Sequence, residues 1–410
     1  MRFFLTAMVI TAFTPCMFAQ RPPMKPVDVI GVDSCAECHD EMVDSWRSSV
    51  HAESFRTLVL SAKAKEMAKK LDIAPSEIPM KASCVRCHFT QEYLASMPQP
   101  TEAVSCESCH GEGFDWIDQH YKKSISRSER IERAGELGMI HPGDTFKVTQ
   151  TCYECHVIDD EQLVNLAGHP AMSEDFEILS WYSGEVAHNY LVQESGRATK
   201  RHSETLQPVP QERRRMLYLT GKLQHVAFTL RAIARAKDPP VDREGRFIEL
   251  PDGNYTYAVQ HAVQLRRLEL DLKKVLHQVT IPQYTKTIAI LRGLNLKTGN
   301  GREMELAAMQ IGQQAQVFTE KYSGGEFGEI DPLLAELRPR YSEHYAAIVK
   351  ALEIRKLAES QSSGASDEEA GAEQAGTTDR VEYVDGGDEG SSEIEERMEE
   401  ATIDGARVGQ

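Results

Sequence analysis

The sequence predicts a mainly α-helical protein in three parts. The first part, residues 27–190, repeats one short cysteine and histidine motif four times and contains nine of the 14 histidines. The second part, residues 205–356, has apolar residues at the three- and four-residue steps of amphipathic helices. The third part, residues 359–410, is rich in Glu, Asp, Gly and Ser. We expect little regular structure in the first part, an α-helical bundle in the second and a disordered acidic tail in the third.

The repeated motif of the first part is Cys-x-x-Cys-His. It is the attachment signature of c-type haem, whose porphyrin is bonded to both thiols and whose iron binds the histidine on one face. Zinc is the alternative, because Cys-x-x-Cys pairs also build structural zinc sites, but zinc leaves the four histidines unexplained. We therefore predict a multihaem cytochrome c domain with four covalently attached haem c groups. The predicted attachment residues are Cys35, Cys38, Cys84, Cys87, Cys106, Cys109, Cys152 and Cys155, and the proximal iron ligands are His39, His88, His110 and His156.

The second axial ligand of each iron decides what that haem can do. Two strong-field ligands give an electron carrier, whereas an empty face gives a site for small molecules. Four doubly His-ligated haems need eight histidines, and the first part supplies nine. The candidates outside the motifs are His51, His120, His141, His169 and His188.

Two stretches that follow motifs resemble the tetrahaem cytochrome c-554 family. The first motif is followed by Ser45-Trp46 and Val50-His51-Ala52, and the third motif by Gly111-Glu112-Gly113 and then His120. The resemblance covers about residues 30–160 and implies an electron-transfer protein. It also implies that His120 is the distal ligand of the first haem, and His51 that of the third or fourth.

The sequence departs from that family before the fourth motif. The family has a distal histidine a few residues ahead of this motif, but Phe146–Thr151 contains none, and His141 is the nearest. The resemblance also implies a second haem without a strong distal ligand. Here His169 and His188 follow the fourth motif among aromatic residues, and we favour both over His141 as distal ligands. All four haems would then have two histidine ligands.

Helical periodicity predicts a bundle in the second part. One helix is expected over Met216–Ile233 and another over Tyr257–Val279, which Pro282 closes. A small hairpin or ordered turn is expected between them, over Phe247–Tyr257. The remaining expected helices are Gln283–Leu294, Arg302–Tyr322 and Pro332–Ala358 in the second part, and Ala36–Ser48 and Glu53–Leu71 in the first.

The N-terminus predicts export. Residues 1–19 have a positive charge at Arg2, an apolar run over Phe3–Phe13 and a small residue, Ala19, at the end. This is the pattern of a cleaved signal peptide. The run is too short for a comfortable membrane span. We expect a periplasmic protein with no transmembrane segment in the mature chain.

Charge is concentrated at the other end of the chain. Leu357–Gln410 contains 16 acidic and 3 basic residues, a net charge of −13 out of −17 for the whole chain. This segment has too few apolar residues to fold on its own. No basic patch with interleaved aromatic residues is present, so nucleic acid is not an expected partner.

The function expected from these features is electron transfer between periplasmic or membrane-bound redox proteins. Only 17 residues separate His88 from Cys106, which places the second and third haems close together. The alternative is a haem enzyme in which one open iron acts on a small nitrogen or sulfur species, such as nitric oxide, nitrite or hydroxylamine. We predict no catalytic acid or base, because no such constellation stands out.

The mature protein is expected to exceed the mass of its polypeptide by four haems. Covalent thioether bonds survive denaturation, so the colour should stay with the protein during acid-acetone extraction. Intact-protein mass spectrometry measures the increment directly. A mass increment of zinc, or no increment, would contradict the haem assignment.

Overall fold

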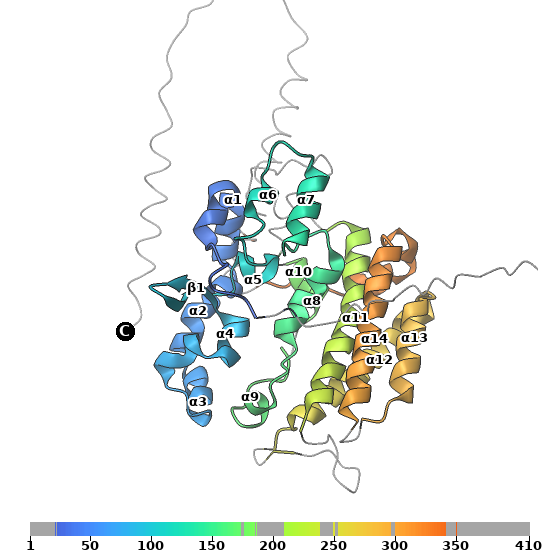
Figure 1. Ribbon diagram of the computed structural model, residues 1–410. Coiled ribbons are helices and arrows are strands. Elements are labelled where there is room, and N and C mark those ends of the chain that lie inside the picture. The colour runs from blue at the N-terminus through green and yellow to red at the C-terminus, as the bar shows by residue number, and fades with distance from the viewer. Residues whose placement is uncertain are drawn as a thin grey trace, which may run out of the picture. The chain divides into compact units, whose positions relative to one another are not determined.

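A computed structural model of the chain describes residues 21, 23–173, 176–184, 186, 209–237, 249–250, 253–296, 300–341 and 350. The predicted signal peptide (1–19), His188 and the predicted acidic tail (359–410) lie outside these residues. The described chain is mainly helical, as predicted (Figure 1). Within it, no helix combines the length and the apolar character that a membrane crossing requires.

The first part of the chain is built from short helices joined by turns. It has more regular structure than expected, because a helix carries each of the four motifs. The helix predicted over Glu53–Leu71 is broken at Ser61, whose hydroxyl accepts the Ala64 N–H and caps the next helix. The helices of this part are α1 (Val32–Arg47), α2 (Val50–Leu60), α3 (Ala62–Lys70), η1 (Pro75–Met80), α4 (Ala82–His88), α5 (Cys106–His110), α6 (Ile117–His120), α7 (Arg127–Glu136), α8 (Thr145–His156), α9 (Glu161–Asn165) and α10 (Ile178–Tyr182).

A β-hairpin lies between the second and third motifs. Its strands are β1 (Thr90–Leu94) and β2 (Met97–Glu102), which pair antiparallel with Leu94 opposite Met97. The two turn residues, Ala95 and Ser96, have φ values of 49° and 69°. Two-residue hairpins favour Asn or Gly at such positions. The sequence has neither there, so it offered no hairpin signal.

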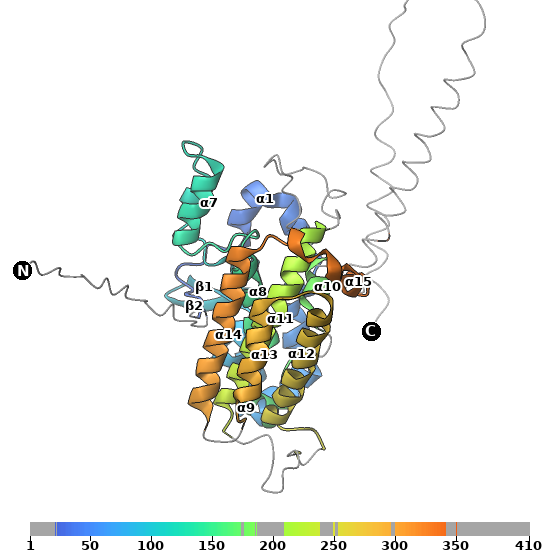
Figure 2. The same cartoon turned by 90° about the vertical axis from the view of Figure 1, so that its right-hand side faces the viewer.

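The second part forms the predicted helical bundle (Figures 1 and 2). Helix α11 packs against α12 and α14, and α13 packs against α12 and α14. Pro282 is the first residue of α13, where its missing N–H costs nothing. The bounds are α11 (Gln211–Arg235), α12 (Tyr257–Gln278), α13 (Pro282–Gly293), α14 (Gly301–Lys321), η4 (Gly325–Ile330) and α15 (Asp331–Ala335).

Two local expectations for the second part have mixed outcomes. The turn expected near Gly253 is present, since Glu249 and Tyr255 form an antiparallel bridge. The helix expected over Pro332–Ala358 is present at its start but is wrong after Ala335. Only α15 forms there, and residues 336–341 are not helical.

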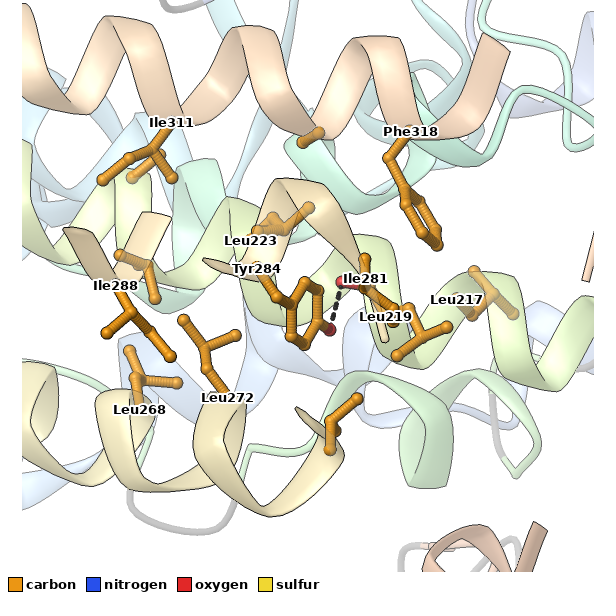
Figure 3. Close-up of a cluster of buried hydrophobic side chains, with 14 of the residues drawn as sticks. Leu217, Leu219, Leu223, Leu268, Leu272, Ile281, Tyr284, Ile288, Ile311 and Phe318 are labelled. Carbon is orange, nitrogen blue, oxygen red and sulfur yellow. Dashed lines mark hydrogen bonds between the residues drawn. The ribbon is translucent and has the colours of Figure 1, made fainter. Parts of the chain in front are cut away.

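Leucine, isoleucine and aromatic side chains fill the core of the bundle (Figure 3). Leu223 of α11, Leu272 of α12 and Ile311 of α14 are each 0% exposed. Tyr284 of α13 is equally buried, and its hydroxyl donates a 2.8 Å hydrogen bond to the Leu219 carbonyl oxygen. This hydrogen bond satisfies the one polar group that Tyr284 brings into the core, so burying the hydroxyl carries little penalty.

The two parts share this core. Tyr182 of α10 is buried in the bundle cluster, and the Arg213 guanidinium donates 3.1 Å hydrogen bonds to its hydroxyl and to the Gly143 carbonyl oxygen. Gly221 lets α11 approach α10 closely, since a Cβ there would lie 2.7 Å from Cγ2 of Ile178 in α10. The boundary between the predicted haem domain and the predicted bundle therefore runs through packed side chains.

Replacing Leu272 with alanine should lower the free energy of unfolding by about 2–5 kcal/mol, because it leaves a cavity in a closely packed core. Leu270 on the same helix is 46% exposed, so Leu270→Ala is the matched control and should change stability little. Denaturant unfolding followed by circular dichroism measures both. Equal losses in the two variants would contradict the placement of this core.

Candidate haem sites

Each Cys-x-x-Cys-His motif lies in a helical turn. The second, third and fourth motifs end α4, α5 and α8 at His88, His110 and His156. The first motif lies in α1, whose backbone is kinked at His39 (φ −127°, ψ 38°). In a helix, residues i, i+3 and i+4 share one face. Both thiols and the imidazole of each motif therefore reach one side, as a single porphyrin requires.

The four motif helices contact one another in a fixed order. Helix α1 contacts α5, α5 contacts α8, and α8 contacts α4. The order along the protein is thus first, third, fourth and second motif.

The cysteines of neighbouring motifs confirm this order. The Cys35 thiol hydrogen-bonds to that of Cys106, which lowers the pKa of Cys35. A hydrogen bond with Cys87 likewise lowers the pKa of Cys155. These contacts link the first motif to the third and the second motif to the fourth.

Two arginines hold the motifs in this order. Arg21 donates a 2.8 Å hydrogen bond to the Ser108 carbonyl oxygen in the third motif and pairs at 3.6 Å with the buried Glu154 carboxylate in the fourth. Arg86 of the second motif donates to the Glu154 carbonyl oxygen (3.3 Å) and pairs with Asp159 (2.7 Å). These contacts hold the third motif next to the fourth, and the fourth motif next to the second.

A carboxylate inside the third motif organises the chain around it. Glu107 is 1% exposed and accepts hydrogen bonds from the backbone N–H groups of Ile30 (3.0 Å), Gly31 (3.0 Å) and Gly113 (2.7 Å). Burial raises the pKa of Glu107, and the three amides oppose this rise. Gly111 ends the helix with φ +85°, where a Cβ would lie 2.4 Å from the Gly138 carbonyl oxygen. Glu107 thereby ties the chain before the first motif to the third motif.

Three motif histidines lie opposite histidines from distant parts of the chain. The distal partners come from α2, α6 and the turn after α9, and they include three of the four residues predicted from sequence. The pairs are His39 with His120 (6.0 Å between ring centroids), His156 with His51 (6.4 Å) and His88 with His169 (6.4 Å).

These separations fit one iron between each pair of rings. A metal–imidazole bond is about 2.0 Å and a ring nitrogen lies about 1.2 Å from its ring centroid, so two imidazoles on opposite faces of one metal have centroids about 6.4 Å apart. The rings are not stacked face to face, since their planes meet at 42°, 67° and 65°. Edge-to-face ring contacts span the same range of centroid separations. The centroid separations are therefore compatible with two imidazole ligands on one iron.

Hydrogen bonds fix which nitrogen of the ring is free. The His169 Nδ1 lies 2.8 Å from the Pro170 carbonyl oxygen, and the His110 Nδ1 lies 2.9 Å from that of Ile140. A carbonyl oxygen only accepts, so Nδ1 carries the proton and Nε2 keeps its lone pair for a metal. The His156 Nδ1 lies 2.9 Å from the Ser173 hydroxyl, which can donate or accept, so this contact does not fix the proton of His156.

His141 has the opposite arrangement. Its Nδ1 accepts a 3.0 Å hydrogen bond from the Gly143 N–H. In a neutral ring the proton then sits on Nε2, which leaves no lone pair there for a metal. Burial, and then the charges of Arg127 and His110, lower the pKa of His141, so this ring lies near the third motif. His188, the other predicted ligand, lies outside the described residues and stays a prediction.

Burial keeps the paired imidazoles neutral. It lowers the pKa of His88 to about 4, with smaller contributions from His169 and His51. It lowers the pKa of His120 to about 4, aided by His39, and that of His156 to about 3, aided by His51. A metal binds only the neutral ring, so these sites need no proton release before an iron binds.

A cavity of about 500 Å³ opens beside the second motif. Cys84, Cys87, His88 and His169 all line it. The two thiols, the proximal imidazole and the opposing imidazole therefore share one open space. These residues fit a haem c group.

Sequence reasoning missed the aromatic contacts around the fourth motif. Phe176 stacks on His156 with ring centroids 3.8 Å apart, and Tyr153 stacks on His225 of α11 at 4.7 Å. It also missed Glu107, because one glutamate inside a motif carries no local signal of burial. These residues act through packing, which neither spacing nor composition reports.

Comparison with known proteins agrees with the resemblance seen in the sequence. Residues 34–111 match the sequence profile of the family described as "Cytochrome c554 and c-prime". This segment is similar to the domain that the profile describes. It holds the first three motifs, so c-type haem and an electron-transfer role are what the match implies.

A curated relative is similar over a larger stretch. "Cytochrome c-554" of Nitrosomonas europaea (strain ATCC 19718 / CIP 103999 / KCTC 2705 / NBRC 14298) is 28% identical over 134 residues. The aligned stretch covers 31% of this chain and 57% of that protein. The chain thus spans little more than half the length of this relative. No solved structure matches.

Replacing Glu107 with glutamine should lower the free energy of unfolding by about 1–3 kcal/mol, because the new amide donor would meet a backbone N–H. Glu37, the exposed glutamate inside the first motif, provides the matched control Glu37→Gln. Urea unfolding of the haem-loaded proteins measures both variants. An unchanged Glu107→Gln variant would show that the buried carboxylate does not hold the third motif.

Proposed function

We propose that the protein is a periplasmic tetrahaem c-type cytochrome that transfers electrons between redox partners through closely spaced, mostly bis-His haems. The observation that carries this proposal is the set of three histidine pairs at 6.0–6.4 Å. Two histidines on one iron leave no face for a substrate and favour one-electron transfer. When bound, each haem supplies an iron that alternates between its ferric and ferrous states.

The order of the motif helices supports a relay. Contacts run from α1 to α5, then to α8 and α4. Electrons would pass from the first haem through the third and fourth to the second, or in reverse. Because the helices hold the sites, the relay needs no moving parts.

The proposed ligand set follows the pairs. His120 would bind opposite His39, and His51 opposite His156. His169 would bind opposite His88, at the haem for which the family resemblance implies no strong distal ligand. For the third haem the proposed distal ligand is His188, on sequence grounds and because the His141 ring holds its proton toward the wrong side.

Export and partners are part of the same proposal. The predicted signal peptide at residues 1–19 supports a periplasmic location. The partners would be periplasmic or membrane-bound redox proteins, since a chain of buried one-electron centres requires a donor and an acceptor.

One observation favours the alternative function, a haem enzyme. The cavity beside His88 is also lined by Asp159, Asp160 and Glu161. If His169 did not bind iron, the second haem would present an open face to a space with carboxylates. Nitric oxide, nitrite or hydroxylamine would then be the class of substrate.

Ligand replacement separates these two functions. The wild-type reduced protein is expected not to bind carbon monoxide readily. His120→Ala and His169→Ala should each create one high-spin haem and bind about one equivalent of carbon monoxide, because each removes one distal ligand. Optical titration with carbon monoxide and electron paramagnetic resonance of the oxidised protein measure the change.

The matched control is His141→Ala, which should leave the spin state unchanged. Carbon monoxide binding by the wild-type protein, together with no further change in His169→Ala, would establish an open second haem and favour the enzyme.

A further inference from the structure

Helix α3 forms one wall of the cavity beside the second motif. Ala64, Met67 and Ala68 of α3 line this cavity together with His88 and His169. Any protein that exchanges electrons with the second haem through this opening therefore meets α3.

The exposed surface of α3 is strongly basic. Its nine residues, AKAKEMAKK, include four lysines and one glutamate. Among the four lysines of α3, only Lys70 forms an ion pair with a described residue. Its Nζ lies 3.2 Å from the Glu66 carboxylate. The exposed lysines, which we call the lysine rim, are Lys63, Lys65, Lys69 and Lys70.

Two members of the lysine rim lie at the turn that carries His169. A Cβ on Gly168 would lie 3.9 Å from the Nζ of Lys70. Burial lowers the pKa of His169, and the charge of Lys63 lowers it further. Lys70 therefore lies beside the turn that carries His169, while the residues of α3 that line the cavity are Ala64, Met67 and Ala68.

Exposed apolar residues accompany these lysines. Leu60, two residues before α3, is 65% exposed, and Leu166, two residues before Gly168, is 56% exposed. Small apolar contacts among charges suit a transient electron-transfer complex, which buries less than about 1,200 Å².

The opposite end of the motif order has the opposite charge. Helix α1 exposes Asp33, Glu37, Asp40 and Asp44 beside the first motif. The whole chain is also acidic, with a net charge of −17. The lysine rim is thus a basic helix face next to a cavity that Asp159, Asp160 and Glu161 line on the inside.

We propose that the lysine rim is the docking face for an acidic surface of a redox partner protein, which exchanges electrons with the second haem. The inference rests on the proposed function, since a docking face serves a carrier only if the second haem is part of a relay. Four like charges on one helix beside the opening steer an acidic partner and orient it before contact. A basic partner would be repelled here.

Charge removal on the rim tests this proposal. In the variant, Lys63, Lys65, Lys69 and Lys70 are all replaced by glutamine, which keeps helix propensity. The matched control replaces four exposed cations of the bundle, namely Lys286, Arg292, Arg302 and Lys321, by glutamine. The probes are a small single-haem cytochrome c and the same protein with succinylated lysines, so the two acceptors differ in charge alone.

The reduced holoprotein is mixed with each acceptor by stopped flow at low ionic strength. The rim variant should reduce the succinylated acceptor about tenfold more slowly than the wild type, and the basic acceptor no more slowly. The bundle control should keep the wild-type rate. The difference should vanish at about 0.5 M salt, where the charges are screened.

Other outcomes separate the two proposals. Equal slowing by the rim and bundle variants, or no slowing by either, would overturn the docking face while leaving the carrier intact. A wild-type protein that holds four haems and reduces neither acceptor would overturn the carrier itself. If the fourfold rim variant loses haem, Lys63→Gln with Lys70→Gln, the pair nearest His169, repeats the test with a smaller change.

Discussion

The separation of paired imidazoles is the constraint on which the first part of this protein depends. Each pair joins residues at least 81 positions apart in the sequence and holds the two ring centroids 6.0–6.4 Å apart. Bringing such distant residues together costs chain entropy that a single contact cannot offset. The packing of the motif helices and the core shared with the bundle offset this cost. So do the contacts of Arg21, Arg86 and Glu107, which we call the clamps.

The clamps act where the motifs meet. Arg21 and Arg86 both reach Glu154, and Glu107 gathers three backbone amides around the third motif. Removing a charge from one such buried contact leaves its partner unsatisfied, which costs more than the contact itself stabilises. These residues therefore hold the haem sites in place although none of them would touch an iron.

The bundle has a defined relation to the haem sites. Helix α11 packs along α8, and His225 stacks on Tyr153 inside the fourth motif. The bundle thus covers the side of the fourth site, while the second site opens into a cavity next to α3. Coverage at one site and access at another would give the proposed relay a place at which partners can meet it.

The sequence by itself predicted the four haem motifs, their proximal histidines and most of the bundle, although it did not predict that a helix carries each motif. It could do so because these features repeat at fixed spacings, with i, i+3 and i+4 for the motifs and helical steps for α11 and α12. Family resemblance added His51 and His120, and the structure places both opposite motif histidines.

Only the tertiary structure decided which imidazole lies opposite which. Spacing could not show that His169 faces His88, because the contact depends on how α9 and α4 pack against their neighbours. It could not distinguish the proton positions of His141 and His169 either, since each follows from one backbone hydrogen bond. Long-range packing and hydrogen bonding select among chemically equal histidines, and neither leaves a trace in local sequence.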